Sequence, residues 1–135
     1  MEPNIAHTPR VLVVENNPEV LDLITAMVTS LDCDALSAAS VEEARHILAQ
    51  GPIDALITDL VLGDGDGLEL IREMRARGDE APALMIFSYA SPELQSTARR
   101  AGAVDLLAKP FRLERLSQVL VQVLKSCNPS AVSTH

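Results

Sequence analysis

Five short apolar runs, spaced fairly evenly along the chain, predict five β-strands. They are Arg10–Val14, Asp34–Ala38, Ile53–Thr58, Ala83–Phe87 and Val104–Ala108. The second run is weak, but the others are continuous rather than alternating between apolar and polar residues. Continuous runs are typical of strands that are covered on both faces, as in a parallel sheet.

Segments with apolar residues at helical spacing follow each of these runs, and the last extends from Leu113 to Leu124. Residues that cap, start or stop helices mark most of their ends. These signals are Asn17 before Pro18, a capping box at Ser40–Glu43, Gly51, Gly78, Ser91 before Pro92, and Gly102. A strand followed by a helix, five times over, predicts an α/β fold with a doubly wound, five-stranded parallel sheet and helices on both faces.

The chain length suits a single domain. We divide it into an N-terminal extension over residues 1–9, a domain over residues 10–126 and a polar C-terminal tail over residues 127–135. Nineteen acidic residues against 11 basic ones give a net charge of −8, which disfavours binding to nucleic acid. No apolar run is long enough to span a membrane and no secretion signal is evident, so we expect a cytoplasmic protein.

Polar residues follow four of the five predicted strands. Glu15 and Asn16 follow the first strand, Asp59 the third, Ser88 the fourth and Lys109 the fifth. Because the carboxyl ends of parallel strands meet at one sheet edge, where such folds bind ligands, these side chains are expected to lie together. The second strand contributes no such group.

This set of residues favours phosphoryl chemistry at a magnesium ion. Mg²⁺ prefers one or two carboxylates together with water and phosphate oxygens. An aspartate beside the ion can attack phosphorus, and a lysine and a hydroxyl suit the oxygens of the transferred group. Taken singly, an aspartate after a strand is more often a turn residue and a lysine is usually solvated, so only their joint placement carries the argument.

Two other classes of site fit less well. The acidic, glycine-rich segment Gly63–Gly67 suggests a calcium loop, but aligning Gly67 with the invariant glycine puts Leu62 at the first ligand position. The segment also follows a strand rather than a helix. A nucleotide-binding turn after the first strand would need glycines, which residues 15–18 lack.

From Arg10 to Lys125 the sequence resembles the receiver domain of bacterial response regulators. The resemblance rests on the order and spacing of Val11–Glu15, Leu56–Leu60, Asp66–Leu70, Phe87–Ser88, Gly102–Asp105 and Leu107–Phe111. It implies a flavodoxin-like fold with strand order 2-1-3-4-5. It also implies a phosphoacceptor rather than a conventional enzyme, with at most self-catalysed phosphotransfer and autodephosphorylation.

The resemblance also assigns roles to individual residues. Asp59 matches the phosphoacceptor, Ser88 the switch hydroxyl and Lys109 the lysine that pairs with the phosphoryl group. The implied Mg²⁺ ligands are Glu15, Asn16, Asp59 and the backbone carbonyl of Val61. The Lys109–Pro110 peptide bond is cis in similar proteins.

Three positions depart from the family pattern. Asn16 replaces the usual aspartate, which should weaken Mg²⁺ binding and slow phosphorylation. Leu106 stands where a switch aromatic is usual. Tyr89 follows Ser88 where a small residue is common; it either restricts access to the phosphoryl pocket, replaces the missing aromatic at the switch, or lies on the surface.

Two functions therefore remain open at this stage. The first is a receiver that takes a phosphoryl group from a histidine kinase or phosphotransfer protein. It would signal to a partner or output domain through the face formed by the fourth helix, fifth strand and fifth helix, where a homodimer could also form. The second is a pseudo-receiver that docks partners without phosphorylation, because Asn16 weakens the metal site.

Overall fold

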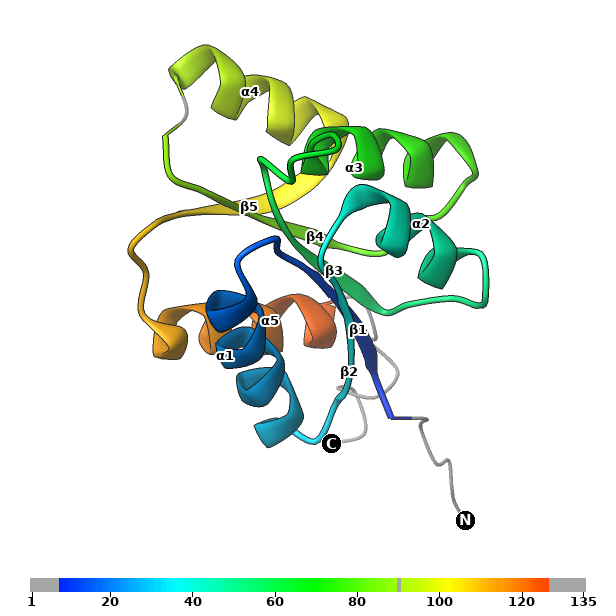
Figure 1. Cartoon of the computed structure of the whole chain (residues 1–135), viewed down its shortest axis with the longest axis vertical. Coiled ribbons are helices and arrows are strands. Elements are labelled where there is room, and N and C mark those ends of the chain that lie inside the picture. The colour runs from blue at the N-terminus through cyan, green and yellow to red at the C-terminus, as the bar shows by residue number, and fades with distance from the viewer. Residues whose placement is uncertain (1–7, 90, 127–135) are drawn as a thin grey trace.

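Five parallel strands alternate with five helices in the computed structural model, which describes residues 8–89 and 91–126 (Figure 1). The strands are β1 (Arg10–Val14), β2 (Asp34–Ala38), β3 (Ala55–Asp59), β4 (Ala83–Phe87) and β5 (Ala103–Ala108). The helices are α1 (Pro18–Ser30), α2 (Val41–Leu48), α3 (Gly67–Ala76), α4 (Pro92–Ala101) and α5 (Leu113–Ser126). The sheet order is β2-β1-β3-β4-β5, which confirms the predicted fold and topology.

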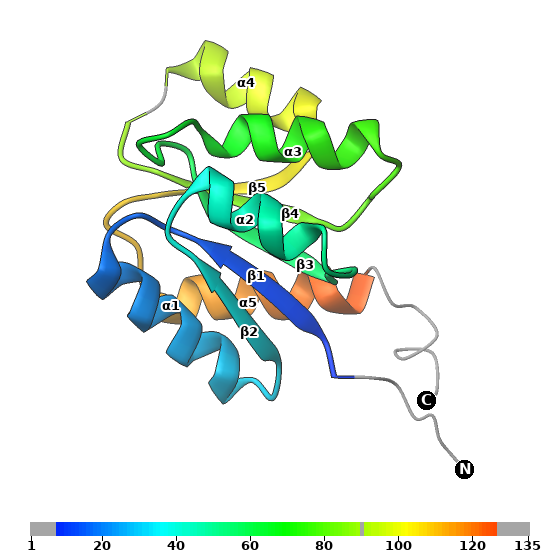
Figure 2. The same cartoon turned by 45° about the vertical axis from the view of Figure 1, so that its right-hand side comes forward.

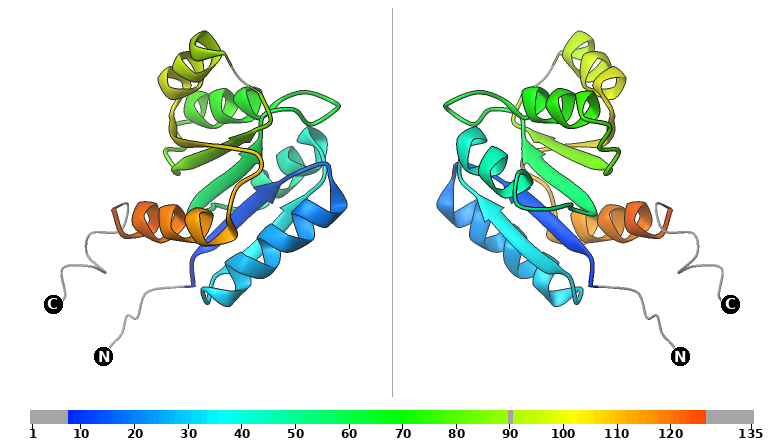
Figure 3. Two further views of the ribbon diagram at one scale, coloured as in Figure 1. Left: turned by 90° about the vertical axis from the view of Figure 1, so that its left-hand side faces the viewer. Right: turned by 90° about the vertical axis from the view of Figure 1, so that its right-hand side faces the viewer.

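The helices cover the two faces of the sheet in two groups. Helices α1 and α5 lie on one face, and α2, α3 and α4 lie on the other (Figures 2 and 3). Alternate residues of each strand face opposite sides, so Leu12 and Leu56 pack toward α2 and α3 while Val13 and Ile57 pack toward α1 and α5. This two-sided burial explains the continuous apolar runs in the sequence.

Most of the predicted element ends are confirmed, and the exceptions have local causes. Strand β3 begins at Ala55 rather than Ile53, because the preceding Asp54 bonds through its side chain to the backbone N–H of Arg10. Helix α2 ends at Leu48, before the predicted stop at Gly51.

The capping box predicted at Ser40–Glu43 forms only in part, and a complete one that was not predicted forms at the start of α3. The Ser40 hydroxyl accepts from the Glu43 N–H, but the Glu43 carboxylate accepts from Ala39 N–H instead of closing back on Ser40. Asp66 and Glu69 form a complete box at the start of α3.

The predicted terminal segments lie largely outside the described residues, which begin at residue 8 and end at residue 126. Within the described ranges, every helix is too short or too polar to cross a membrane.

Gly67 allows α3 to begin directly against β3. A Cβ atom at this position would lie 2.5 Å from the backbone oxygen of Asp59 and 2.8 Å from two side-chain atoms of Thr58. Both neighbours belong to a buried strand and cannot move aside cheaply. The first turn of α3 therefore depends on glycine for its close approach to the sheet.

We predict that Gly67→Ala lowers the free energy of unfolding by about 1–3 kcal/mol, the usual cost of overpacking. Urea denaturation would measure the change. Gly51→Ala is the matched control, because its new methyl group would meet only the flexible end of the Arg10 side chain. Equal effects of the two substitutions would contradict this account of Gly67.

Candidate functional site

Three charged side chains meet at the carboxyl edge of the sheet. Glu15 directly follows β1, Asp59 is the last residue of β3 and Lys109 directly follows β5. Lys109 Nζ lies 2.7 Å from Asp59 Oδ2 and 3.1 Å from Glu15 Oε1. Parallel strands thus bring together residues that are far apart in sequence, as the sequence predicted.

The two carboxylates are buried, with relative exposures of 1% for Glu15 and 6% for Asp59. Each is oriented by a backbone N–H two residues further along the chain. Glu15 Oε2 accepts from Asn17 N–H at 3.0 Å, and Asp59 Oδ1 accepts from Val61 N–H at 3.1 Å. Buried carboxylates held in this way are uncommon outside functional sites and need a nearby cation.

The electrostatics of the site raise the pKa of both Glu15 and Lys109. Burial raises the pKa of Glu15, and the neighbouring Asp59 raises it further, against the opposing effects of the Asn17 N–H and Lys109. Burial alone would lower the pKa of Lys109, but its contacts with Asp59 and Glu15 outweigh that effect and raise it. Lys109 is therefore a firmly charged ammonium that compensates two carboxylates.

The remaining predicted residues surround this centre without contacting it as closely. Asn16 is exposed, and its side-chain nitrogen lies 4.0 Å from the position that a Cβ atom would take at Gly63. Val61 contributes its backbone to the site, while its side chain is 65% exposed. Ser88 is also exposed and lines an apolar pocket of about 400 Å³ together with Lys109 and residues of α1.

The residues that depart from the family pattern lie in different environments. Leu106 is half-buried and packs against the core beneath α2, α3 and α4. Tyr89 is 83% exposed. The Lys109–Pro110 peptide bond is cis, as the resemblance implies.

The side chains at the site are of the kind that binds Mg²⁺, but few of them could be ligands. Within the described part of the chain, no three acidic, histidine or cysteine side chains gather into a metal-binding group. A cation would therefore need Asn16, a backbone oxygen or phosphate oxygens besides Glu15 and Asp59. Among the described residues the one close partner of Glu15 Oε1 is the Lys109 ammonium, at 3.1 Å, so a cation bound by this oxygen would share it with Lys109. Two carboxylates with open positions fit the coordination that Mg²⁺ prefers.

The sequence predicts no site residue after β2. A contact that it does not predict lies there instead: the first N–H groups of α2 bind Asp64 of the loop that follows Asp59. No sequence signal marks this contact, because Asp64 and Val41 are 23 residues apart and aspartate is common in loops.

Comparisons with known proteins agree with this geometry. Residues 11–121 match the family model described as response regulator receiver domain. The chain is 36% identical to the response regulator protein PilR of Pseudomonas aeruginosa over 122 residues, covering 90% of this chain and 27% of that protein. It is 34% identical to the transcriptional regulatory protein MalR of Bacillus subtilis over 112 residues, covering 82% of this chain and 48% of that protein. The chain thus spans about a quarter to a half of the length of these relatives.

Solved structures show the same fold. The signal receiver domain of a putative LuxO repressor protein from Vibrio parahaemolyticus superposes with a TM-score of 0.87 at 23% identity, covering 96% of this chain and all of that one. A CheY-like receiver domain protein from Methanospirillum hungatei superposes with a TM-score of 0.86 at 21% identity, covering 92% and 99% of the two chains.

We predict that Glu15→Gln stabilises the protein at neutral pH, measured by urea unfolding in a chelating buffer. A raised pKa means that the folded state holds a proton that the unfolded state releases. Wild-type stability therefore falls as pH rises from the ordinary glutamate value of 4.5 through the higher folded pKa. The variant lacks this loss, so its advantage should grow between pH 4.5 and pH 7.5.

The matched control for this prediction is Glu80→Gln, which removes an exposed carboxylate elsewhere. It should leave the pH dependence of stability unchanged. A Glu15→Gln variant that is less stable than the wild type at pH 7.5 would contradict the electrostatic account of the site.

Proposed function

The chain belongs to the response-regulator receiver family, and from that premise we propose that Asp59 accepts a phosphoryl group from a histidine kinase or a phosphotransfer protein. The observation that carries the proposal is the position of Asp59, a buried carboxylate at a strand end, 2.7 Å from a lysine ammonium and beside a second buried carboxylate. Response regulators of this family work with histidine kinases and output domains.

The proposed reaction is an in-line displacement at phosphorus. An Asp59 oxygen attacks the phosphorus of a phosphohistidine, the new O–P bond forms and the P–N bond breaks. The other ring nitrogen of the phosphohistidine carries a proton, so the imidazole leaves as a neutral ring when it keeps the electron pair of the broken bond. Asp59 attacks as the carboxylate, and its two oxygens accept from the Val61 N–H and from Lys109 Nζ.

Mg²⁺, which receiver domains of this family generally bind, would neutralise charge on the transferring group. We propose Glu15, Asn16, Asp59 and the Val61 carbonyl as its protein ligands. Lys109 would pair with the phosphoryl oxygens, which bring up to about two negative charges. The site already holds two carboxylates and one ammonium, so both Mg²⁺ and Lys109 are needed to balance the charge of the phosphoryl group.

We propose that the response to phosphorylation begins at Ser88, whose hydroxyl would donate to the phosphoryl group. Ser88 follows β4 and shares a pocket with Lys109, so a small movement of the loop would bring it to the site. Leu106 and Tyr89 would repack with it. The α4–β5–α5 face would pass the change to an output domain, a partner protein or a second copy of the chain, in the cytoplasm, without direct contact to nucleic acid or membrane.

A second candidate function is a pseudo-receiver that docks partners without being phosphorylated. The observation that favours it is Asn16, which leaves the site with two carboxylates, both already paired with Lys109. Weak Mg²⁺ binding would make phosphorylation slow, and the fold would then serve as a constant docking surface.

We predict that acetyl phosphate with Mg²⁺ gives a single phosphoryl adduct on the wild-type protein, detected by intact-mass spectrometry. Asp59→Asn should give none, because its amide keeps the shape of the side chain but is not a nucleophile. An unmodified wild-type protein would favour the pseudo-receiver. An adduct that persists in Asp59→Asn would show that the phosphoacceptor is another residue.

We also predict that Asn16→Asp tightens Mg²⁺ binding by about tenfold, because it adds a third carboxylate to the ligand set. A Mg²⁺ titration followed by amide chemical shifts would measure the dissociation constant. Asn17→Asp is the matched control, since Asn17 caps α1 and orients Glu15 only through its backbone. Equal affinities in the wild type and Asn16→Asp would mean that residue 16 is not a ligand.

A further inference from the structure

The loop between β3 and α3 carries Val61 and is folded back on itself. Leu62 N–H donates to Gly65 O at 3.0 Å, and Val61 pairs with Asp66 in an isolated antiparallel bridge. Asp64 therefore lies at the tip of a short hairpin whose base is at Asp59. Such a loop could be displaced as a unit unless its tip is held.

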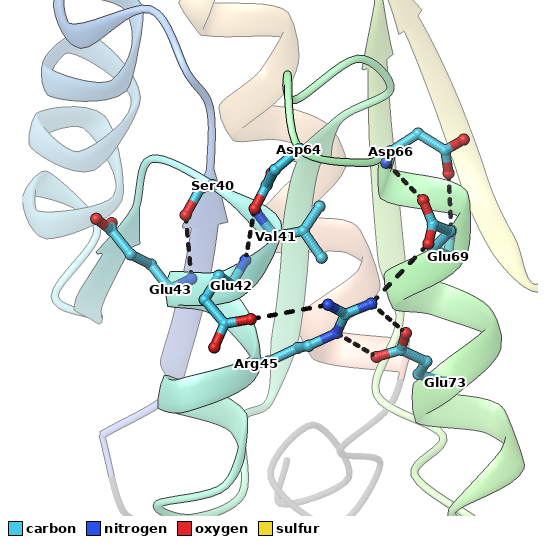
Figure 4. A network of polar contacts seen from close by, with 9 residues as sticks. All are labelled: Ser40, Val41, Glu42, Glu43, Arg45, Asp64, Asp66, Glu69 and Glu73. Carbon is cyan, nitrogen blue, oxygen red and sulfur yellow. Dashed lines mark hydrogen bonds and ion pairs between the residues drawn. The ribbon is translucent and has the colours of Figure 1, made fainter.

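The tip of the loop is held by the N-terminus of α2. The two carboxylate oxygens of Asp64 accept from the backbone N–H groups of Val41, at 2.9 Å, and Glu42, at 3.1 Å (Figure 4). The next N–H, that of Glu43, donates to the hydroxyl of Ser40, the residue directly before α2. Asp64 thus satisfies helix donors that the local sequence leaves unpaired, and the helix dipole favours its negative charge.

The strength of these contacts distinguishes Asp64 from the ion pairs around it. The N–H groups of Val41 and Glu42 lower the pKa of Asp64, which means that they bind its charged form. Arg45 also links α2 to α3 through a bidentate pair with Glu73, but both side chains are 42% exposed. Asp64 is also exposed, but Arg45 and Glu73 join α2 to α3, whereas the bonds from Asp64 join α2 to the loop itself, so they are the contacts that restrain its tip.

The packing around the tip also fits a fixed loop. A Cβ atom at Gly65 would lie 2.8 Å from Glu69 Oε1 and 3.1 Å from Val41 Cγ2. The Glu69 carboxylate is the end of a flexible side chain and could move aside, so Val41 is the firmer limit on the size of residue 65.

We infer that Asp64 is a positioning residue of the phosphoacceptor site: by binding the N-terminus of α2, it holds the β3–α3 loop so that the Val61 backbone faces Asp59. The inference rests on the proposed function, because it gives the loop a role in holding Mg²⁺ and the phosphoryl group. It also gives a function to the carboxyl end of β2, which supplies no side chain to the site.

The test compares two variants that each remove a cap from the same helix. Asp64→Ala removes the cap supplied by the loop, and Ser40→Ala removes the helix's own cap. Native-state hydrogen exchange would then be measured for the amides of Val61 and Leu62. Asp64→Ala should accelerate the exchange of these two amides by about tenfold, the factor that corresponds to the usual loss of stability when a helix cap is removed. Ser40→Ala should accelerate only the exchange of the Glu43 amide.

A Mg²⁺ titration of the same variants, followed by amide chemical shifts, forms the second arm. Asp64→Ala should weaken Mg²⁺ binding by about tenfold, the usual effect of losing a group that orients a metal ligand, and Ser40→Ala should leave it unchanged. Asp64→Asn keeps one acceptor oxygen, so its exchange rates and affinity should fall between those of the wild type and Asp64→Ala.

The outcomes separate this inference from the proposed function. If Asp64→Ala accelerates exchange only at Val41 and Glu42 and leaves Mg²⁺ binding unchanged, Asp64 is merely a helix cap and the inference is overturned. If the wild type binds neither Mg²⁺ nor beryllofluoride, the proposed function fails. The exchange arm alone then decides whether Asp64 holds the loop.

Discussion

The Lys109 ammonium lies between the buried carboxylates of Glu15 and Asp59, and this ionic contact constrains most of what the site can do. Without Lys109, two buried acidic groups would face each other, and burial already raises the pKa of Glu15. With Lys109, the site still carries an excess of negative charge. Under the proposed function that excess would attract a cation, and the same ammonium would pair with a phosphoryl group attached to Asp59.

The fold makes this contact possible because all five strands run in the same direction. The three residues come from the ends of β1, β3 and β5, and Asp59 and Lys109 alone are 50 positions apart along the chain. The apolar strands fix the edge of the sheet, so the positions of the charged groups follow from the packing of the core. The loops then refine the site: Asn17 and Val61 orient the carboxylates through their backbone N–H groups, and Asp64 ties the Val61 loop to α2.

The sequence predicted the sheet, its order and the shared edge, since each follows from periodicity or from motifs of regular spacing. It placed Glu15, Asp59 and Lys109 together because the ends of parallel strands must coincide. It did not predict the capping box at Asp66–Glu69 or the bonds from Asp64 to α2. The segments at Ser40 and Asp66 have similar capping signals, and only the folded structure shows that the one at Asp66 forms the complete box. The bonds from Asp64 join residues that are far apart in sequence and come together only in the folded chain. Ser88 was placed at the correct edge, but its exposure depends on the conformation of a loop that periodicity does not describe.

A high-resolution crystal structure of the protein treated with Mg²⁺ and beryllofluoride would show whether Asp59 is the phosphoacceptor. We expect the phosphoryl mimic bound to an Asp59 oxygen, with Lys109 Nζ moved from the carboxylate to the mimic and Mg²⁺ in contact with Glu15 and Asp59. A structure solved under these conditions in which Asp59 is unmodified and Lys109 still pairs with both carboxylates would contradict it.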